Sequence, residues 1–93
     1  MTKPRRLIDL VSVGPAFVQV FEDLGITEVR QLVDKDHVEL FEELQRLKGR
    51  RVDPCVYDVF QAAIAQARDP NLPPEKCRWP YWSRLRKSRC HSG

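Results

Sequence analysis

Glycine and proline residues divide the first 68 residues of this chain into short segments. Because both residues tend to end helices, the fold is limited to a set of short helices. Each segment places its apolar side chains at the i, i+3, i+4 spacing of an amphipathic helix. No segment alternates apolar and polar residues as a half-buried strand would. The expected helices cover roughly residues 5–11, 15–24, 27–33, 36–48 and 53–67. The sequence therefore predicts an all-α fold, in which five helices pack into one compact bundle.

Local signals mark where three of these helices begin. Pro15 is suited to the first position of a helix, because its missing N–H would have had no partner there. Asp36 followed by Glu39 is typical of a capping box. Asp53 and Pro54 combine an N-cap carboxylate with a proline in the first turn. These residues predict the starts of the second, fourth and fifth helices.

A change of composition divides the chain into a helical bundle at residues 1–68 and a tail at residues 69–93. The tail has four prolines within eleven residues, at Pro70, Pro73, Pro74 and Pro80. Because proline lacks a backbone N–H and clashes with the preceding turn of a helix, we expect this tail to be irregular. Its tryptophans, Trp79 and Trp82, are expected to fold back over an apolar groove of the bundle.

The charges are unevenly distributed. The net charge is +3, yet all thirteen acidic residues lie between Asp9 and Glu75, where they outnumber the basic ones. Nine basic residues lie outside this window, toward the two ends, at Lys3, Arg5, Arg6, Lys76, Arg78, Arg84, Arg86, Lys87 and Arg89. An anionic partner should therefore be attracted mainly to the ends of the chain.

Targeting signals and disulfides are not expected. No apolar run approaches the roughly 20 residues of a membrane span or follows the basic N-terminus as a signal peptide would. The three cysteines are an odd number with no close pair, which suits a reducing compartment. The sequence predicts a cytoplasmic protein that does not contact a membrane.

The segment from Leu10 to Ala16 resembles the helix-hairpin-helix motif, in which two helices flank a Pro-Gly-apolar-Gly turn. In this chain Val11 stands at the proline position and Ser12 at the first glycine, and Pro15 removes one amide. The resemblance implies a SAM-domain-like bundle that holds a phosphate at the start of the second helix, without sequence preference. The donors would be the N–H groups of Val13, Gly14 and Ala16, with Ser12 Oγ. The alternative is that the turn only joins two helices.

A second resemblance covers nearly all of the chain. The most specific stretch is Asp53-Pro54-Cys55-x-x-Asp58-Val59-Phe60, which is similar to small bacterial proteins labelled "pathogenicity locus" or "mitomycin resistance". The helical body is also similar to the C-terminal domains of the bacterial competence regulator and of the RNA polymerase α subunit. This kinship implies the helix-hairpin-helix fold, whereas the label describes genetic context rather than chemistry.

Catalysis and metal binding are not expected. Cys55 near a helix N-terminus could act as a nucleophile with a lowered pKa, but the chain offers only two histidines as a base. An inert, buried cysteine is the simpler interpretation. Cys77, Cys90 and His91 could be arranged around zinc, yet no C-x₂₋₄-C knuckle is present. We therefore expect no enzyme, no metal, no cofactor and no small-molecule substrate.

The sequence favours a module that binds DNA, or another nucleic acid, through its phosphates. Besides the hairpin donors, the expected contacts are cations of the fourth turn and the tail: Lys48, Arg50, Arg51, Arg84, Arg86, Lys87 and Arg89. The alternative is a protein-interaction adaptor, or a homodimer, that docks through Trp79, Tyr81 and Trp82. An acidic run on the fourth helix should keep DNA away from that face: Asp34, Asp36, Glu39, Glu42 and Glu43.

Overall fold

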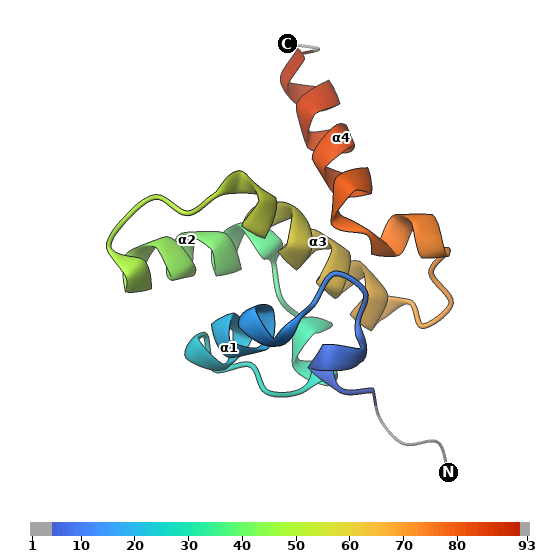
Figure 1. Ribbon diagram of the computed structural model, residues 1–93, viewed down its shortest axis with the longest axis horizontal. Coiled ribbons are helices and arrows are strands. Elements are labelled where there is room, and N and C mark those ends of the chain that lie inside the picture. Colours follow the sequence, from blue (N-terminus) through green and yellow to red (C-terminus); the bar gives the residue numbers. More distant parts are fainter. Residues whose placement is uncertain (1–4, 92–93) are drawn as a thin grey trace.

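The computed structural model describes residues 5–91 of the 93, with side chains from residue 5 to residue 88. Four α-helices make up the fold: α1 (Pro15–Asp23), α2 (His37–Lys48), α3 (Pro54–Arg68) and α4 (Trp79–His91). Three single turns of 3₁₀ helix connect them: η1 (Leu7–Asp9), η2 (Val29–Leu32) and η3 (Pro74–Cys77). The described part of the chain contains no strand. In Figure 1, α3 lies in the middle, and α4 begins beside α3 and projects beyond the other helices at its C-terminal end.

The expected number of five helices is wrong, because two of the predicted segments form only 3₁₀ turns. The helix predicted at residues 5–11 forms only η1, and just after η1 the side-chain amide of Gln66 binds both the N–H and the C=O of Val11. The helix predicted at residues 27–33 forms only η2, and just after η2 the guanidinium of Arg68 donates to the carbonyl oxygens of Val33 and Lys35. In both segments a distant side chain takes backbone groups that a longer helix would have used.

The expectation of an irregular tail is also wrong, because the chain forms α4 from Trp79 onward. Pro80 is the second residue of this helix, and in the first turn a proline removes no hydrogen bond. The N–H of Trp79 donates to Ser12 Oγ at 3.1 Å, so a distant hydroxyl satisfies one of the amides at the helix start. Proline thus starts this helix instead of preventing it.

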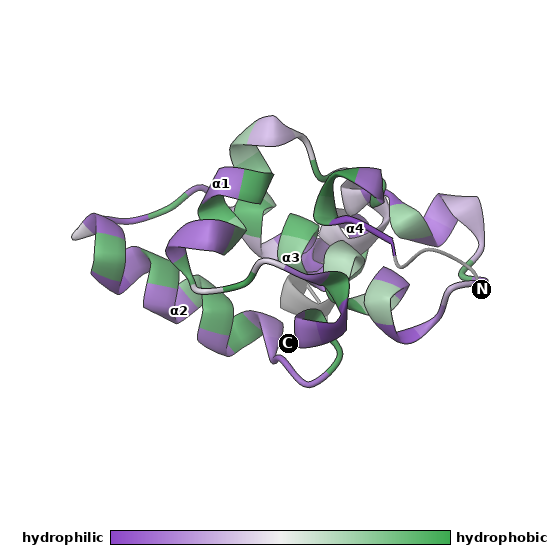
Figure 2. Cartoon of the chain, turned by 90° about the horizontal axis from the view of Figure 1, so that it is seen from below, coloured by the Kyte–Doolittle hydropathy of each residue, from purple (hydrophilic) through white to green (hydrophobic). Residues whose placement is uncertain are grey.

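The core lies between α1, α2 and α3, as the periodicity predicts. Phe21 and Phe60 are fully buried, with ring centroids 5.4 Å apart. Leu40 and Leu44 of α2 are 3% and 2% exposed, so they close the core from the other side. Figure 2 shows hydrophobic and hydrophilic residues alternating along α1 and α2, as expected of helices with one buried face.

The predicted N-caps of α2 and α3 are present, but the reciprocal bond of the predicted capping box, from the Asp36 N–H to the Glu39 carboxylate, is not formed. The Asp36 carboxylate accepts the N–H of Val38 at 2.7 Å, and the Asp53 carboxylate accepts the N–H of Cys55 at 2.9 Å. Gly49 ends α2 in the left-handed region, at φ 66°. These three residues fix the α2–α3 turn and its direction.

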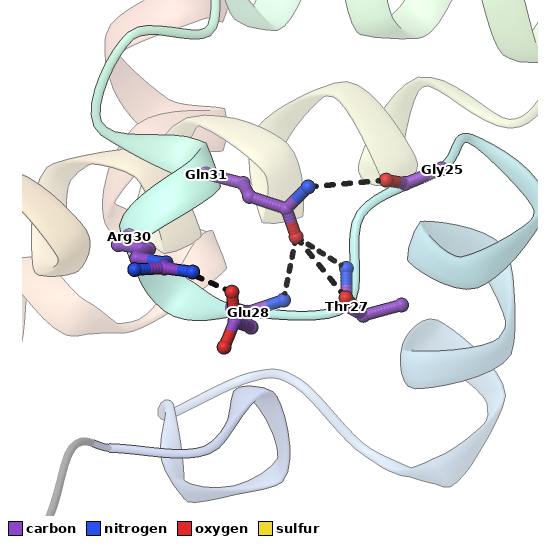
Figure 3. Close-up of polar contacts among 5 residues, drawn as sticks. All are labelled: Gly25, Thr27, Glu28, Arg30 and Gln31. Carbon is purple, nitrogen blue, oxygen red and sulfur yellow. Dashed lines mark hydrogen bonds and ion pairs between the residues drawn. The ribbon is translucent and has the colours of Figure 1, made fainter.

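The loop between α1 and η2 is held by one glutamine side chain (Figure 3). Gln31 Oε1 accepts the N–H groups of Thr27 and Glu28 at 2.7 and 2.8 Å, and its Nε2 donates to the carbonyl of Gly25. The side chain therefore satisfies the backbone of a turn that would otherwise be open to solvent. An exposed ion pair between Arg30 and Glu28, at 2.8 Å, completes this loop.

Helix α4 runs back along α3 in the opposite direction. Its first residue is bonded to Ser12, whereas Arg86, farther along α4, pairs with Asp58 in the first half of α3. No helix in the described part of the chain is both long and apolar enough to cross a membrane.

Candidate nucleic-acid interface

In the first turn, at residues 10–16, Ser12 stands where the helix-hairpin-helix motif has its first glycine. Ser12 adopts a φ of 72°, in the left-handed region that favours glycine. Val13 is 5% exposed and anchors the turn in the core. The Gln66 amide holds the turn from α3 by binding Val11 at 2.9 and 3.0 Å. The turn is therefore fixed on both sides before α1 begins.

Two of the four predicted donors in this turn are already engaged. The N–H of Val13 donates to the carbonyl of Leu10 at 3.2 Å. Ser12 Oγ accepts the N–H of Trp79 and donates to the carbonyl of Cys77 at 3.5 Å. Ser12 therefore connects the turn to α4, and its hydroxyl is not directed at a ligand.

The other two predicted donors remain available. Among the described residues, no atom accepts the N–H of Gly14 or the N–H of Ala16, whereas the next amide, from Phe17, donates to the carbonyl of Gly14. Ala16 is exposed, and apart from Gly14 and its two chain neighbours no heavy atom lies within 4 Å of the place where a Cβ on Gly14 would stand. Two backbone donors thus stand at the positive, exposed N-terminus of α1, a setting suited to an anion.

The predicted cations between α2 and α3 form an exposed basic group. Lys48, Arg50 and Arg51 are exposed, and none of them forms an ion pair within the described part of the chain. Arg46, which was not among the predicted contacts, is exposed in the last turn of α2, four residues before Arg50. The i, i+4 spacing of Arg46 and Arg50 was the signal that could have identified it. The basic turn, defined as Arg46, Lys48, Arg50 and Arg51, lies at the N-terminal end of α3.

The predicted cations of the tail divide between two roles. Arg84 and Lys87 are exposed on α4. Arg86 instead donates through Nε and Nη2 to the two carboxylate oxygens of Asp58, each at 3.0 Å. Because Asp58 is fully buried, this pair connects α4 to α3 as part of the fold. Lys3 and the side chain of Arg89 lie outside the described residues.

The hairpin donors and the basic turn lie near opposite ends of α3. The hairpin is attached to Gln66, whereas the basic turn leads into Asp53. The helical rise between these two residues corresponds to roughly 20 Å. The structure therefore does not gather all the predicted contacts in one cleft.

The three aromatic residues predicted as a docking surface, Trp79, Tyr81 and Trp82, differ in how far they are exposed. Trp82 is half-buried, and its indole N–H donates to the carbonyl of Lys76 at 2.7 Å. Its ring meets Tyr81 edge-on at 5.1 Å. Trp79 is 38% exposed at the start of α4. A shallow depression of about 390 Å³ beside it is lined in part by Tyr81, Arg78 and Arg84.

The environment of Cys55 disfavours a reactive thiolate. Burial raises the pKa of the Cys55 thiol, and the neighbouring carboxylate of Asp53 raises the pKa further. This is opposite to the lowered pKa that a nucleophile at a helix N-terminus would have. Burial likewise raises the pKa of Cys77. The ring of His37 lies against Tyr57, with Nε2 3.0 Å from the phenolic oxygen.

Within the described residues, no three histidine, cysteine, aspartate or glutamate side chains come together around a space for a metal ion. Cys55 and Cys77 are free thiols. The side chains of Cys90 and His91, which the sequence analysis considered as zinc ligands, lie outside the described residues.

Residues 1–88 match the protein family described as "Pathogenicity locus". The chain belongs to the pathogenicity locus family. Mitomycin resistance protein McrB of Streptomyces lavendulae is 42% identical over 76 residues, which cover 82% of this chain and 67% of that protein. No solved structure matches the chain significantly.

In this pathogenicity locus protein, the segment that carries the resemblance builds the first half of α3. Asp53 caps the helix, Asp58 pairs with Arg86, and Phe60 is fully buried in the core. Each of these three residues therefore has a structural role. The hairpin donors and the basic turn lie outside this segment.

Proposed function

We propose that this protein binds nucleic acid through the phosphate backbone, with the first turn acting as a helix-hairpin-helix element. The observation that carries this proposal is the pair of backbone donors at Gly14 and Ala16, which have no acceptor among the described residues. The left-handed Ser12 supports it, because the motif places a glycine there. Contacts to phosphate carry no base information, so binding is independent of sequence.

The exposed cations add long-range attraction to this local contact. The basic turn, together with Arg84 and Lys87, offers cations that are not neutralised by ion pairs among the described residues. Each cation that neutralises a phosphate releases counterions, so the affinity falls steeply as salt is raised. Arg86 does not belong to this set, because Asp58 holds it.

Substitutions at Gly14 test the proposal without disturbing the fold. Gly14 is the N-cap of α1 with an extended backbone at φ −97°, and a side chain there would meet open space. Gly14→Asn and Gly14→Asp should both cap the helix, because either side chain accepts the first-turn amides. Both variants should therefore be at least as stable as the wild type. Only the aspartate places a negative charge at the proposed phosphate position.

The expected result is a graded loss of affinity for a short duplex at low salt, measured by fluorescence anisotropy. Gly14→Ala should bind as the wild type does, and Gly14→Asn somewhat more weakly. Gly14→Asp should bind about tenfold more weakly, since it loses a hydrogen bond to a charged group. Undiminished binding by Gly14→Asp, or no binding by the wild-type protein, would refute the proposal.

The exposure of Trp79 favours a second candidate function, that of an adaptor that docks a protein. Aromatic and arginine side chains dominate the energetics of protein interfaces, and Trp79 stands beside Arg78 on the surface. A pull-down whose partner survives nuclease treatment and is lost in Trp79→Ala would support this function. Trp82→Ala is the poorer test, because it also removes the bond to Lys76.

A further inference from the structure

A two-lobed groove lies over the α2–α3 turn. One lobe has a volume of about 700 Å³, and the other about 510 Å³. Gln45 and Arg51 line both lobes, so the two adjoin. Each lobe by itself is within the usual size of small-ligand sites. None of the residues considered for catalysis, metal binding or the first hairpin lines this groove. Its lining does include Arg86 and three residues of the basic turn, Arg46, Arg50 and Arg51.

The larger lobe is aromatic and fixed in shape. Phe41 and Tyr57 line it, and their rings meet edge-on with centroids 5.6 Å apart. The phenolic oxygen of Tyr57 lies 3.0 Å from Nε2 of His37, whose ring also meets Tyr57 edge-on. Two neighbours therefore hold the half-buried Tyr57 ring in place. A ring held in this way loses little entropy when a planar ligand packs against it.

The groove carries an excess of positive charge. Three guanidinium groups that form no ion pair among the described residues line its two lobes, from Arg46, Arg50 and Arg51, against the carboxylates of Glu42 and Asp53. One of these carboxylates, from Asp53, is occupied by the N–H of Cys55. Arg86 is held in the wall of the groove by its two bonds to Asp58. An anionic group is therefore favoured next to the aromatic lobe.

We propose that this groove holds one nucleotide of a single strand, with its base against Tyr57 and Phe41 and its phosphate on Arg51 and the basic turn. Base–aromatic stacking beside a cationic path is the usual means of binding single strands. A paired base in a duplex cannot enter a lobe between two helices. The inference rests on the proposed nucleic-acid function and adds to it a preference for an unpaired base.

The test compares a fluorescein-labelled thymidine octamer with a duplex of the same length, by anisotropy at low salt. Arg51→Glu is the principal variant, because Arg51 is exposed and its replacement should not affect folding. Lys35→Glu is the matched control: it makes the same charge change at the opposite end of α2. Tyr57→Leu removes the ring, whereas Tyr57→Phe keeps the ring and removes only the hydroxyl.

Tyr57→Leu should weaken single-strand binding about tenfold, as expected for loss of one stacked base, and should leave duplex binding nearly unchanged. Tyr57→Phe should retain single-strand binding. Arg51→Glu should weaken single-strand binding at least about tenfold, as Tyr57→Leu does. Lys35→Glu should weaken single-strand binding by less than about fivefold. Wild-type affinity in Arg51→Glu, or equal losses for octamer and duplex in a folded Tyr57→Leu, would overturn the groove proposal.

Further outcomes separate this proposal from the proposed function. If Gly14→Asp loses octamer binding while Arg51→Glu and Tyr57→Leu keep it, the hairpin function stands and the groove proposal is refuted. If Gly14→Asp has no effect while the groove variants do, the groove proposal stands without the hairpin. An octaglutamate peptide that competes for the groove as well as the octamer does would also refute it, because charge alone would then explain binding.

Discussion

The residue with the most consequential polar contacts is Gln66, which is 5% exposed. Its Oε1 accepts the N–H of Val11 at 2.9 Å, and its Nε2 donates to the carbonyl oxygens of Val11, Ala62 and Cys77. One side chain therefore joins the first hairpin, α3 and η3. It also explains why the hairpin keeps its shape although the first segment is not a helix.

We predict that Gln66→Leu lowers the free energy of unfolding by about 2–3 kcal/mol, because it leaves buried backbone groups without partners. Gln66→Glu should cost a similar amount, since a carboxylate would face three carbonyl oxygens and have no hydrogen to donate. Urea unfolding measures both. Gln61→Glu on the same helix is the control and should be nearly neutral; equal midpoints for Gln66→Glu and the wild type would contradict the prediction.

At the scale of the element, α4 depends on a residue 67 positions away in the sequence. Ser12 satisfies the first amide of α4, and it does so from a left-handed backbone that costs free energy for any residue with a Cβ. The hydroxyl and the backbone strain thus act in opposite directions on stability. Two substitutions can separate these contributions.

We expect Ser12→Ala to lower the free energy of unfolding by about 1 kcal/mol, because it keeps the strain and loses the hydrogen bond. Ser12→Gly loses the same bond but relieves roughly 1 kcal/mol of strain, so its stability should be close to that of the wild type. Thermal and urea unfolding of the two variants give the comparison. The account of this turn is wrong if the alanine variant is as stable as the glycine variant.

At the scale of the whole molecule, α4 is held to the body mainly through α3, and one pair at this contact is ionic. The Arg86 side chain is 29% exposed and its partner Asp58 is 0% exposed. Removing one member of a buried ion pair leaves the other charge buried without a partner. The loss of folding free energy is therefore larger than the stabilisation that the pair itself provides. Both tryptophans of the chain lie in α4, so fluorescence reports on α4 while circular dichroism reports on all helices.

The wild-type protein should therefore unfold in one transition that fluorescence and circular dichroism report at the same urea concentration. Arg86→Met should lower the free energy of unfolding by about 3 kcal/mol and move the fluorescence midpoint below the circular dichroism midpoint. Arg84→Met, an exposed neighbour on α4, should leave the two midpoints together. Separate midpoints in the wild type would show that α4 is not a cooperative part of the fold.

The sequence by itself determined α1, α2 and α3 and the faces that they bury. The signals for these helices are local: Pro15, Asp36, Gly49 and Asp53 act within one turn, and apolar spacing follows from the helix period. The donors at Gly14 and Ala16 were predicted from the resemblance to the helix-hairpin-helix motif, and they have no acceptor because a helix leaves its first amides without intrahelical partners. Family membership also followed from the sequence.

Only the tertiary structure decided the rest, because the deciding partners are far apart in the chain. Gln66 and Arg68 shortened two predicted helices by binding their backbone groups. Ser12 supports a helix in a segment whose prolines predicted none. The ion pair with Asp58 removes Arg86 from the predicted phosphate contacts and holds its side chain in the lining of the groove. Spacing along the sequence contains no information on such pairs, since folding alone brings their atoms within hydrogen-bond distance.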